Sequence, residues 1–326
     1  MGDVVGMVLC AGLGTRLRPL TNRVPKTAIP LCGVPLVSFS LGLLAGAGVR
    51  RAVVNVHHLP GLMVAAAEAA ARALGISLAV SREPVIAGTG GALREARAHL
   101  AGAEAIFLVN GDVLFDVDLS AALAAHRAFG ALATMLLLPM PAGAGYAAVE
   151  TDGSGAVRRI AGAFGPGGEG LTPWHFSGVH VLSPELLERV PAQPFEADVN
   201  RHVYPPLMAS GAVRGLVVGG TWNDLGTPAR YLEASADVLA GRVRLARFPG
   251  VDPFAGTRAL APGVRAAATA RIDPAARLEA PAYVGERCVL PAGARVQDAI
   301  LWDDTALSPG ETLQHAIAAG AERVRR

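Results

Sequence analysis

Glycines and basic residues gather near the start of the chain, in the stretch "LCAGLGTRLRPLTNRVPKTAIP". Gly12 and Gly14 follow a short apolar run, and Arg16, Arg18 and Lys26 come directly after them. Backbone N–H groups in a glycine-rich loop can bind phosphate, and basic side chains add charge-assisted hydrogen bonds. The spacing therefore predicts a triphosphate-binding loop, with Arg18 open between this role and a surface role.

Two common phosphate-binding motifs do not fit this stretch. A dinucleotide fingerprint needs a third glycine and an acidic residue about 20 positions further on. Leu17 stands where the third glycine belongs, and the next predicted strand ends at Asn55 and His57 without a carboxylate. A Walker A loop needs Gly-Lys-Ser/Thr, which is absent from the stretch. The loop is thus predicted to bind phosphate in another way.

Two aspartates have surroundings that suit a metal ion. Asp112 ends the apolar segment "AIFLVNGDV", and Asp224 lies in "TWNDLGTP". Mg²⁺ prefers hard oxygen ligands, usually one or two carboxylates together with phosphates and water. Taken alone, each aspartate also fits a turn-capping or helix-start role. The nearby Asp116 and Asp118 lie along the following segment and are interpreted as structural.

Strands that alternate with helices must position these residues. Such alternation predicts an α/β fold with a Rossmann-like, mainly parallel sheet flanked by helices. In such sheets ligands bind beyond the carboxyl ends of the strands, where the glycine-rich loop and Asp112 both fall. The predicted strands are 4–9, 51–56, 77–81 and 105–113, and the predicted helices are 33–48, 63–74 and 90–100.

Composition excludes several classes of function. The formal charge is +2 and aromatic residues make up 5%, so neither a cationic footprint nor a stacking surface for nucleic acid is expected. The uncharged stretches 33–49 and 130–149 are interrupted by Pro, Ser or Gly, so no membrane association is expected. The three cysteines are widely spaced, which favours a reducing cytoplasm over a disulfide framework.

The C-terminal quarter follows a different period. Arg, Pro and Gly dominate 241–265, which reads as a linker between a catalytic domain (1–240) and a repeat domain (266–326). A hexapeptide period predicts a short left-handed β-helix of about three coils, ending in a tail from His315, through which we expect a homo-oligomer to assemble. The apolar residues that mark the period are Ile272, Leu278, Val284, Leu290, Val296, Leu301, Leu307 and Leu313.

Four motifs in order resemble those of the sugar-1-phosphate nucleotidylyltransferases. "GLGTRLRPLT" with Pro25-Lys26 is similar to their signature, and "EPVIAGTGGAL" to their base-binding loop. "VNGDVLFDVDL" and "GGTWNDLGTPARYLEA" resemble their two metal motifs. The resemblance spans about 4–239. It implies an Mg²⁺-dependent enzyme that joins an NTP to a sugar 1-phosphate and releases pyrophosphate.

The resemblance also implies roles for individual residues. Arg16, Lys26 and Asp112 would be catalytic, with Arg16 on the β- and γ-phosphates and Lys26 between the triphosphate and the sugar phosphate. Asp112 and Asp224 would hold Mg²⁺. The nucleotide would contact Ala11, Gly12, Gly14, Thr15, Arg16, Glu83, Gly88 and Thr89, and the sugar would contact Asn110, Tyr146, Ala147, Glu150, Ser177 and Gly178.

The chain departs from the family pattern at the sugar phosphate. Many members carry a lysine in a Glu-x-Lys-Pro segment whose positions fall here on Gly162 and Phe164. Arg158, Arg159 or a second Mg²⁺ are the candidate substitutes. The gap resembles the branch of mannose-1-phosphate guanylyltransferases and N-acetylmuramate 1-phosphate uridylyltransferases. We therefore expect GTP and mannose 1-phosphate first, with uridylyl or thymidylyl transfer, or a non-catalytic NDP-sugar-binding homologue, as alternatives.

Overall fold

A mixed sheet forms the centre of the larger part of the molecule. The computed structural model describes residues 3–141, 143 and 145–326, and its main sheet has the strand order β10-β9-β11-β6-β1-β4-β5. The half of the sheet that carries the glycine-rich loop, at the end of β1, is parallel, as predicted. Apolar strands buried between two layers of helices suit a parallel arrangement. Its strands are β1 (Val4–Leu9), β4 (Arg51–Val56), β5 (Ser77–Arg82) and β6 (Ala105–Asn110).

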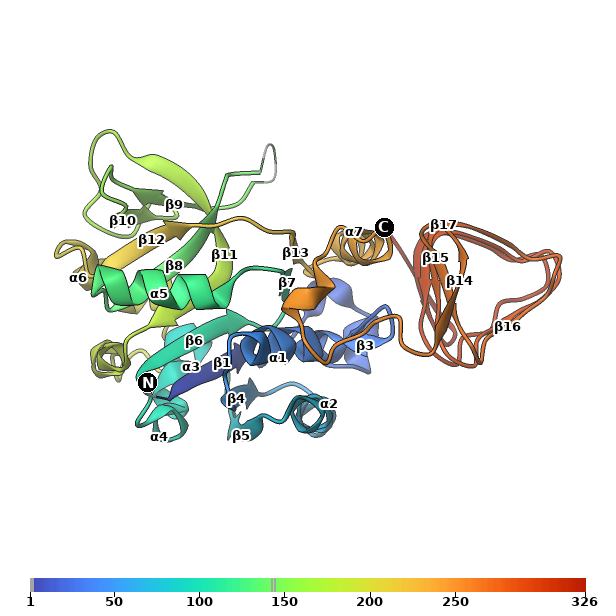
Figure 1. The fold of residues 1–326 in the computed structure, drawn as a ribbon, viewed down its shortest axis with the longest axis horizontal. Helices are drawn as coiled ribbons and strands as arrows, with labels where there is room; N and C mark the ends of the chain where they lie inside the picture. Colours follow the sequence, from blue (N-terminus) through green and yellow to red (C-terminus); the bar gives the residue numbers. More distant parts are fainter. Residues whose placement is uncertain (1–2, 142, 144) are drawn as a thin grey trace.

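The other half of the sheet is largely antiparallel. The long strand β11 runs antiparallel to β6, β8 and β9, while β12 runs parallel to β8 (Figure 1). This half carries the segments predicted to contact the sugar. Its strands are β8 (Ala133–Leu138), β9 (Ala148–Thr151), β10 (Val157–Ile160), β11 (Thr172–Leu182) and β12 (Val213–Val217).

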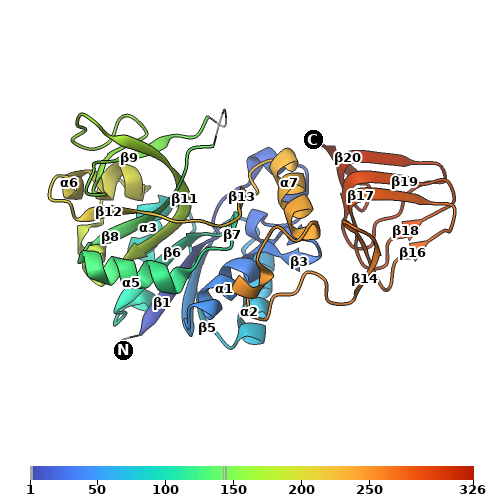
Figure 2. The ribbon, with the colours of Figure 1, turned by 45° about the horizontal axis from the view of Figure 1, so that its top comes forward.

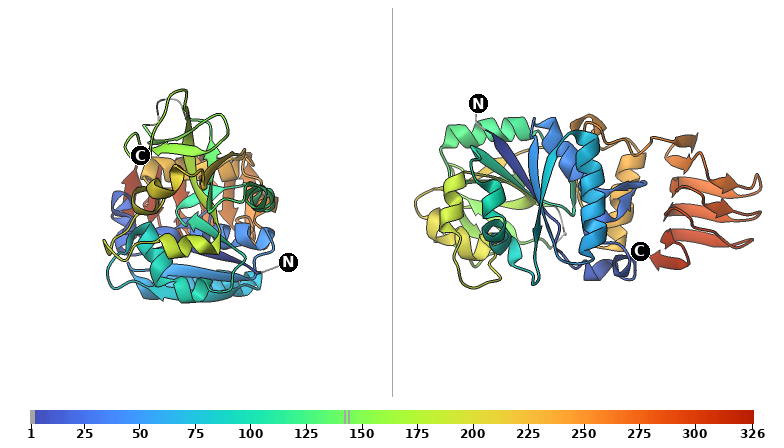
Figure 3. Two further views of the ribbon diagram at one scale, coloured as in Figure 1. Left: turned by 90° about the vertical axis from the view of Figure 1, so that its left-hand side faces the viewer. Right: turned by 90° about the horizontal axis from the view of Figure 1, so that it is seen from below.

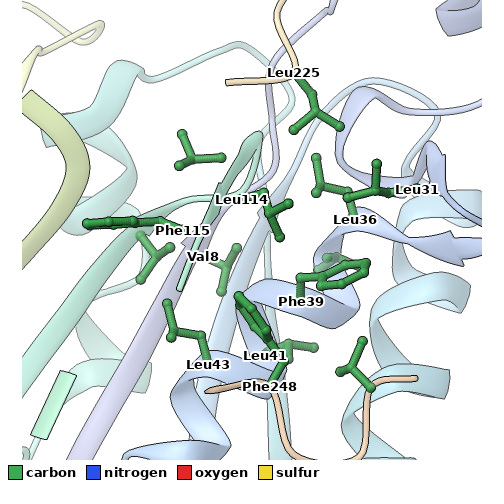
Figure 4. Packing of buried hydrophobic residues seen from close by; sticks show 14 of the residues in the cluster. Val8, Leu31, Leu36, Phe39, Leu41, Leu43, Leu114, Phe115, Leu225 and Phe248 are labelled. Atoms are coloured by element: carbon green, nitrogen blue, oxygen red, sulfur yellow. The ribbon is translucent and has the colours of Figure 1, made fainter. Parts of the chain in front are cut away.

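Helices cover both faces of the sheet. Along β1, Val8 packs into the core shared with α1, α2, α5 and α7, whereas Met7 packs into the core shared with α3, α4 and α6. Figure 4 shows part of the first core, where the rings of Phe39 and Phe248 pack edge-on with their centroids 5.5 Å apart. The helices are α1 (Leu36–Gly46), α2 (Pro60–Leu74), α3 (Gly88–Glu95), α4 (Arg97–Leu100), α5 (Leu119–Phe129), α6 (Pro205–Met208) and α7 (Pro228–Leu239).

Two predicted helices differ from the observed ones. Gly33, with φ +81°, closes a hairpin of β2 (Pro30–Leu31) and β3 (Val34–Pro35), so α1 begins three residues after Gly33. The helix predicted over 90–100 is two helices, α3 and α4, separated at Ala96. In the described ranges, no helix is long and apolar enough to cross a membrane.

Short elements shape the edge of the sheet where the parallel strands end. The glycine-rich stretch continues as three single turns, η1 (Thr15–Leu17), η2 (Leu20–Asn22) and η3 (Lys26–Ala28). Beside it, β7 (Val113–Phe115) pairs antiparallel with β13 (Trp222–Asp224). Other turns are η4 (Pro184–Arg189), η5 (Val199–Val203) and η6 (Leu245–Arg247).

The C-terminal strands stack in coils of the predicted length. Arg277 lies opposite Arg295, an offset of 18 residues, and Arg295 opposite Thr312, an offset of 17. The period-six residues from Val284 to Leu313 are buried inside the stack, as a hexapeptide β-helix requires, while its left hand stays a prediction. The strands are β15 (Val264–Ala267), β16 (Arg271–Ile272), β17 (Arg277–Val284), β18 (Val289–Leu290), β19 (Arg295–Leu301) and β20 (Thr312–Ala319).

The ends of this stack extend beyond the predicted limits. β14 (Thr257–Ala261) lies inside the segment predicted as a linker and pairs with β15. The predicted tail is ordered too, because His315 lies in β20, which pairs with β21 (Glu322–Arg325). Figures 2 and 3 show the stack beside α7, and Tyr283, Ile300 and Ile317 join the core of the larger part.

Candidate active site

A cleft of about 470 Å³ opens where the parallel strands end. Its walls come from the glycine-rich loop after β1, the turn η3, the segment before α3 and the end of β6. Residues that sequence reasoning did not select also line it, among them Asn55 and Gly226. The predicted site residues in the lining are Ala11, Gly12, Gly14, Thr15, Arg16, Lys26, Gly88, Thr89, Asn110 and Asp112.

The two glycines of the loop serve different needs. Gly14 has φ +62°, and a Cβ there would lie 2.9 Å from side-chain atoms of both Lys26 and Thr21. The Thr21 hydroxyl donates to the Gly14 carbonyl at 2.9 Å, which fixes the turn. Gly12 has nothing within 4 Å of its missing Cβ, although it lines the cleft. Gly14 thus shapes the loop, and Gly12 leaves open space above it.

Lys26 and Asp112 form an ion pair in the wall of the cleft. Lys26 is only 9% exposed, and its Nζ contacts Asp112 Oδ2. A buried ammonium group is costly unless it is paired, so this contact explains how Lys26 is held in place. Lys26 belongs to η3 and Asp112 follows β6, so the fold joins two predicted catalytic residues from distant parts of the sequence.

The pairing of β7 with β13 brings the two candidate metal ligands to one end of a short ladder. Asp224 lies opposite Val113, and the Leu225 N–H donates to the Asp112 carbonyl at 2.9 Å. Asp224 Oδ2 accepts from Arg230 Nη1 at 2.5 Å, but its other oxygen, Oδ1, is buried without a hydrogen-bond partner.

These two carboxylates suit Mg²⁺. A buried oxygen without a partner is available to a cation, and Mg²⁺ needs few protein ligands because phosphates and water complete its shell. Within the described part of the chain, no group of three or more His, Cys, Asp or Glu residues gathers as a metal cluster. The donor set therefore fits an ion that is shared with a phosphate substrate.

Glu83 lies beneath the cleft rather than in its lining. It is 4% exposed, and its two carboxylate oxygens accept from Asn55 Nδ2 at 2.8 Å and from the Ala87 N–H at 3.0 Å. Asn55 Oδ1 in turn accepts from the Cys10 N–H at 2.7 Å. Glu83 and Asn55 thus tie the segments after β1 and β5 together, and the contact of Glu83 with a base stays a prediction.

Gly88 and Thr89 anchor the opposite wall. Gly88 has φ +73°, and a Cβ there would lie 2.6 Å from the Ala197 carbonyl oxygen. The Thr89 hydroxyl donates to Asp198 Oδ2 at 3.2 Å and accepts from the Val199 N–H at 2.9 Å. Both residues thus line the cleft while their local contacts fix the loop to the 197–199 segment.

The predicted sugar contacts fall into two groups. Asn110 lines the cleft and packs against Gly178, whose φ is +84° and whose missing Cβ would lie 3.0 Å from Asn110 Nδ2. Tyr146 stacks beside Trp222 and His175, and Ala147 next to it is exposed. These residues form the side of the site next to Asp224.

Ser177 and Glu150 have other partners. Ser177 is fully buried, and its hydroxyl donates to the Leu136 carbonyl at 2.8 Å, so only its backbone borders the site through Trp222 Nε1. Glu150 accepts from Arg159 through both oxygens, and Arg159 lowers the pKa of Glu150. Neither residue is among those that line the cleft, and their contact with a sugar stays a prediction.

The acidic residues interpreted as structural do hold the fold together. Asp116 is fully buried, which alone would raise its pKa, but hydrogen bonds from the Arg244 side chain and from the Arg244 and Thr221 backbone N–H groups lower it on balance. Asp118 caps α5 by accepting from the Ala121 N–H at 3.0 Å. Arg18 is exposed and lies outside the cleft lining.

Three side chains near Asp224 escaped sequence reasoning or were underrated. Arg230 lies in the first turn of α7, which starts at the Thr227 cap and Pro228. Trp222 lies inside the Asp224 motif, two residues before Asp224 in β13. His175 is buried between Tyr146 and Trp222 with both ring nitrogens unpartnered, and burial lowers its pKa. A basic residue one turn after the Thr-Pro helix start was the available signal for Arg230.

A glycine-rich loop, a paired lysine and two aspartates whose backbones meet at the Leu225–Asp112 hydrogen bond gather near the edge where the parallel strands end, an arrangement typical of enzymes that handle nucleoside phosphates. The family model described as nucleotidyl transferase matches residues 5–241. The chain therefore belongs to the nucleotidyl transferase family, which confirms the resemblance to sugar-1-phosphate nucleotidylyltransferases.

Named relatives match nearly the whole chain. A mannose-1-phosphate guanylyltransferase of Mycobacterium tuberculosis is 29% identical over 94% of this chain and 82% of its own length. A UTP–glucose-1-phosphate uridylyltransferase of Synechocystis sp. is 28% identical over 96% and 87%. The solved structure of a putative glucose-1-phosphate thymidylyltransferase from Bacillus anthracis shares the fold, with a TM-score of 0.60 at 16% identity over 72% of this chain and 94% of that one.

Proposed function

We propose that this enzyme transfers a guanylyl group from GTP to mannose 1-phosphate and releases pyrophosphate. The observation that carries the proposal is the Lys26–Asp112 ion pair at the glycine-rich loop, together with the unpartnered oxygen of Asp224 on the strand that pairs with β7 next to Asp112. This arrangement offers a cation and two metal-binding carboxylates around the space where a triphosphate fits. The guanylyltransferase of Mycobacterium tuberculosis, similar over most of both chains, supports the choice of GTP and mannose 1-phosphate.

The triphosphate would lie over the loop from Ala11 to Arg16. Loop N–H groups and the Arg16 guanidinium would bind the β- and γ-phosphates, where charge accumulates as pyrophosphate leaves. Gly226 leaves room for Arg16, because a Cβ on Gly226 would lie 2.9 Å from Arg16 Nη2. Mg²⁺ held by Asp112 and Asp224 would neutralise phosphate charge.

The chemical step is an in-line displacement that these residues position. An oxygen of the sugar phosphate attacks the α-phosphorus, and the bond from that phosphorus to the bridging oxygen of the β-phosphate breaks. Lys26 lies between the loop and Asp112, where it can contact both the α-phosphate and the incoming phosphate. Positioning and charge neutralisation account for most of the rate enhancement in such a reaction.

The second candidate is uridylyl or thymidylyl transfer to another sugar 1-phosphate. It is favoured by the uridylyltransferase of Synechocystis sp., similar over 96% of this chain. Glu83 does not decide between the bases, because a carboxylate can accept from the ring N–H of guanine, uracil or thymine alike.

Pyrophosphate release tests the proposal directly. The full chain would be assayed with Mg²⁺ and each of GTP, UTP, dTTP, ATP and CTP, against mannose, glucose and N-acetylmuramate 1-phosphates. We expect the highest kcat/KM for GTP with mannose 1-phosphate. A preference for UTP or dTTP would favour the second candidate. No turnover with any pair, despite binding of an NDP-sugar, would make the chain a non-catalytic homologue.

Location and assembly belong to the same proposal. We expect a cytoplasmic enzyme that forms a homo-oligomer through the C-terminal strand stack, whose faces and end can dock a second copy. Light scattering of the full chain and of variants in the stack tests the assembly.

A further inference from the structure

Arg230 forms an ion pair with Asp224, the candidate metal ligand nearest to the predicted sugar contact Tyr146. Its Nη1 donates to Asp224 Oδ2 at 2.5 Å, and its guanidinium carbon lies 4.8 Å from the centroid of the Tyr146 ring. The carboxylate and the ring therefore fix the guanidinium from two sides. Its side chain is 30% exposed, so a ligand can reach it.

Arg230 lies close to the residues that line the cleft. Its backbone N–H donates to the Thr227 hydroxyl at 3.3 Å, so it sits in the helical turn that follows Gly226. Burial raises the pKa of Tyr146, and the charges of Asp224, Arg230 and Arg16 all act on that hydroxyl. The two arginines thus flank the same part of the site.

A sugar 1-phosphate needs a cation of its own in this site. A phosphate monoester carries about −1.5 to −2 charges at neutral pH, and it must approach a triphosphate that is also negative. Arg16 belongs to the loop where the triphosphate is proposed to bind, and Lys26 is already paired with Asp112. A further cation near Asp224 and Tyr146 would offset the remaining repulsion.

The two arginines expected to fill this role are occupied elsewhere. Arg158 donates to Asp152 Oδ2 at 2.7 Å and to the Met208 carbonyl at 3.2 Å. Arg159 contacts both oxygens of Glu150. Arg230 also pairs with a carboxylate, but in the proposed function that carboxylate, Asp224, binds a metal ion. Metal binding would therefore release Arg230 from its partner, which is not the case for Arg158 or Arg159.

We propose that Arg230 binds the phosphate of the sugar 1-phosphate, and that Asp224 exchanges Arg230 for the divalent cation when substrates bind. The exchange conserves favourable contacts: Asp224 keeps a positive partner, and the freed guanidinium gains the phosphate oxygens. Arg suits this task because its planar fork can bind a phosphate through two N–H groups. The inference rests on the proposed function and assigns the residue that recognises its second substrate.

Binding measurements on Arg230→Gln and Arg230→Lys test this assignment. Titration calorimetry would measure the dissociation constants of mannose 1-phosphate, of GTP and of Mn²⁺, with the full chain. For Arg230→Gln we expect mannose 1-phosphate to bind about 10- to 100-fold more weakly, the loss of one charge-assisted contact. GTP binding should change by less than about threefold, and Arg230→Lys should recover part of the loss.

Mn²⁺ binding gives a readout of opposite sign. Without the guanidinium, Asp224 loses a competitor, so Mn²⁺ should bind Arg230→Gln more tightly than it binds the wild-type protein. A merely structural role for Arg230 would weaken all ligands together. Arg242→Gln is the matched control, because Arg242 is an exposed arginine that pairs with Asp237 at the other end of α7.

Each outcome decides between the alternatives. Equal binding of mannose 1-phosphate by wild type and Arg230→Gln would overturn the role of Arg230 while leaving the proposed function intact. Weaker GTP binding alone would assign Arg230 to the triphosphate. If the wild type binds no sugar 1-phosphate of the assayed panel, the proposed function itself fails. If Arg230→Gln does not fold, Arg230→Lys is compared with the wild type instead. A weaker affinity for mannose 1-phosphate relative to GTP would support the proposal, and the wild-type ratio of the two affinities would contradict it.

Discussion

Replacing Gly12 by alanine should weaken nucleotide binding, whereas replacing Gly14 by alanine should destabilise the fold. At Gly12 the added methyl meets no protein atom within 4 Å and points into space that lines the cleft. The fold should therefore tolerate Gly12→Ala, and a gain of about 0.4 to 1 kcal/mol in the free energy of unfolding is expected from the stiffer unfolded chain. A phosphate, however, can no longer approach the loop backbone at that point.

The magnitude follows from the contact that is lost. A hydrogen bond to a charged group contributes about 1.5 to 3 kcal/mol, so Gly12→Ala should raise the KM for the nucleotide about 10- to 150-fold. At Gly14 the methyl meets Lys26 and Thr21 at 2.9 Å with φ at +62°, so Gly14→Ala should lower the unfolding free energy by about 1 to 3 kcal/mol. Urea denaturation and steady-state kinetics measure both effects. A normal KM in Gly12→Ala would refute the assignment of this loop to the triphosphate.

Three further predictions concern the framework. Asn55→Ala leaves a buried backbone N–H and a buried carboxylate oxygen without partners, so it should cost about 2 to 6 kcal/mol of unfolding free energy in urea. Trp302→Phe removes a donor 3.0 Å from the Tyr231 hydroxyl, so it should cost about 1 to 2 kcal/mol. Burial lowers the pKa of His126 to about 4 and of His180 to about 3. Both histidines stay neutral in the fold, so below pH 6.5 only the unfolded chain takes up their protons and the free energy of unfolding falls. By pH 5 the two histidines together should lower it by about 4 kcal/mol.

Matched controls separate these effects from general damage. Asn22→Ala alters an exposed asparagine and should change the unfolding free energy by less than about 0.5 kcal/mol. His99→Asn alters an exposed histidine and should keep the wild-type dependence on pH. Equal losses in Asn55→Ala and Asn22→Ala would contradict the network around Glu83. A flat stability between pH 6.5 and 5 would contradict neutral, buried histidines, and a Trp302→Phe protein as stable as the wild type would contradict the Tyr231 contact.

Local signals in the sequence predicted the framework well. Apolar segments that alternate with helical ones identified β1, β4, β5 and β6. The period of six identified the inward residues of the C-terminal stack. Its limits were missed because β14 and β21 pair antiparallel at the ends, outside the repeat.

Side-chain partners were harder to predict than motifs. Glu83 and Ser177 fall in the motifs that the resemblance selected, but their hydrogen bonds to Asn55 and to Leu136 depend on strands that are distant in the sequence. Arg230 was missed for the same reason. Its pairing with Asp224 depends on how α7 follows β13, which no local pattern encodes. Motifs therefore located the site, and only the fold assigned the partners.

The central claim is that Asp112 and its neighbours at the glycine-rich loop carry out nucleotidyl transfer. Pyrophosphate release by Asp112→Asn, compared with Asp118→Asn and the wild type, tests it most directly. Asp118 caps α5 six residues away, and asparagine can keep that cap. The account predicts that Asp112→Asn loses at least about a hundredfold in kcat with its fold intact, while Asp118→Asn keeps its activity. Pyrophosphate release by Asp112→Asn at the wild-type rate would contradict it.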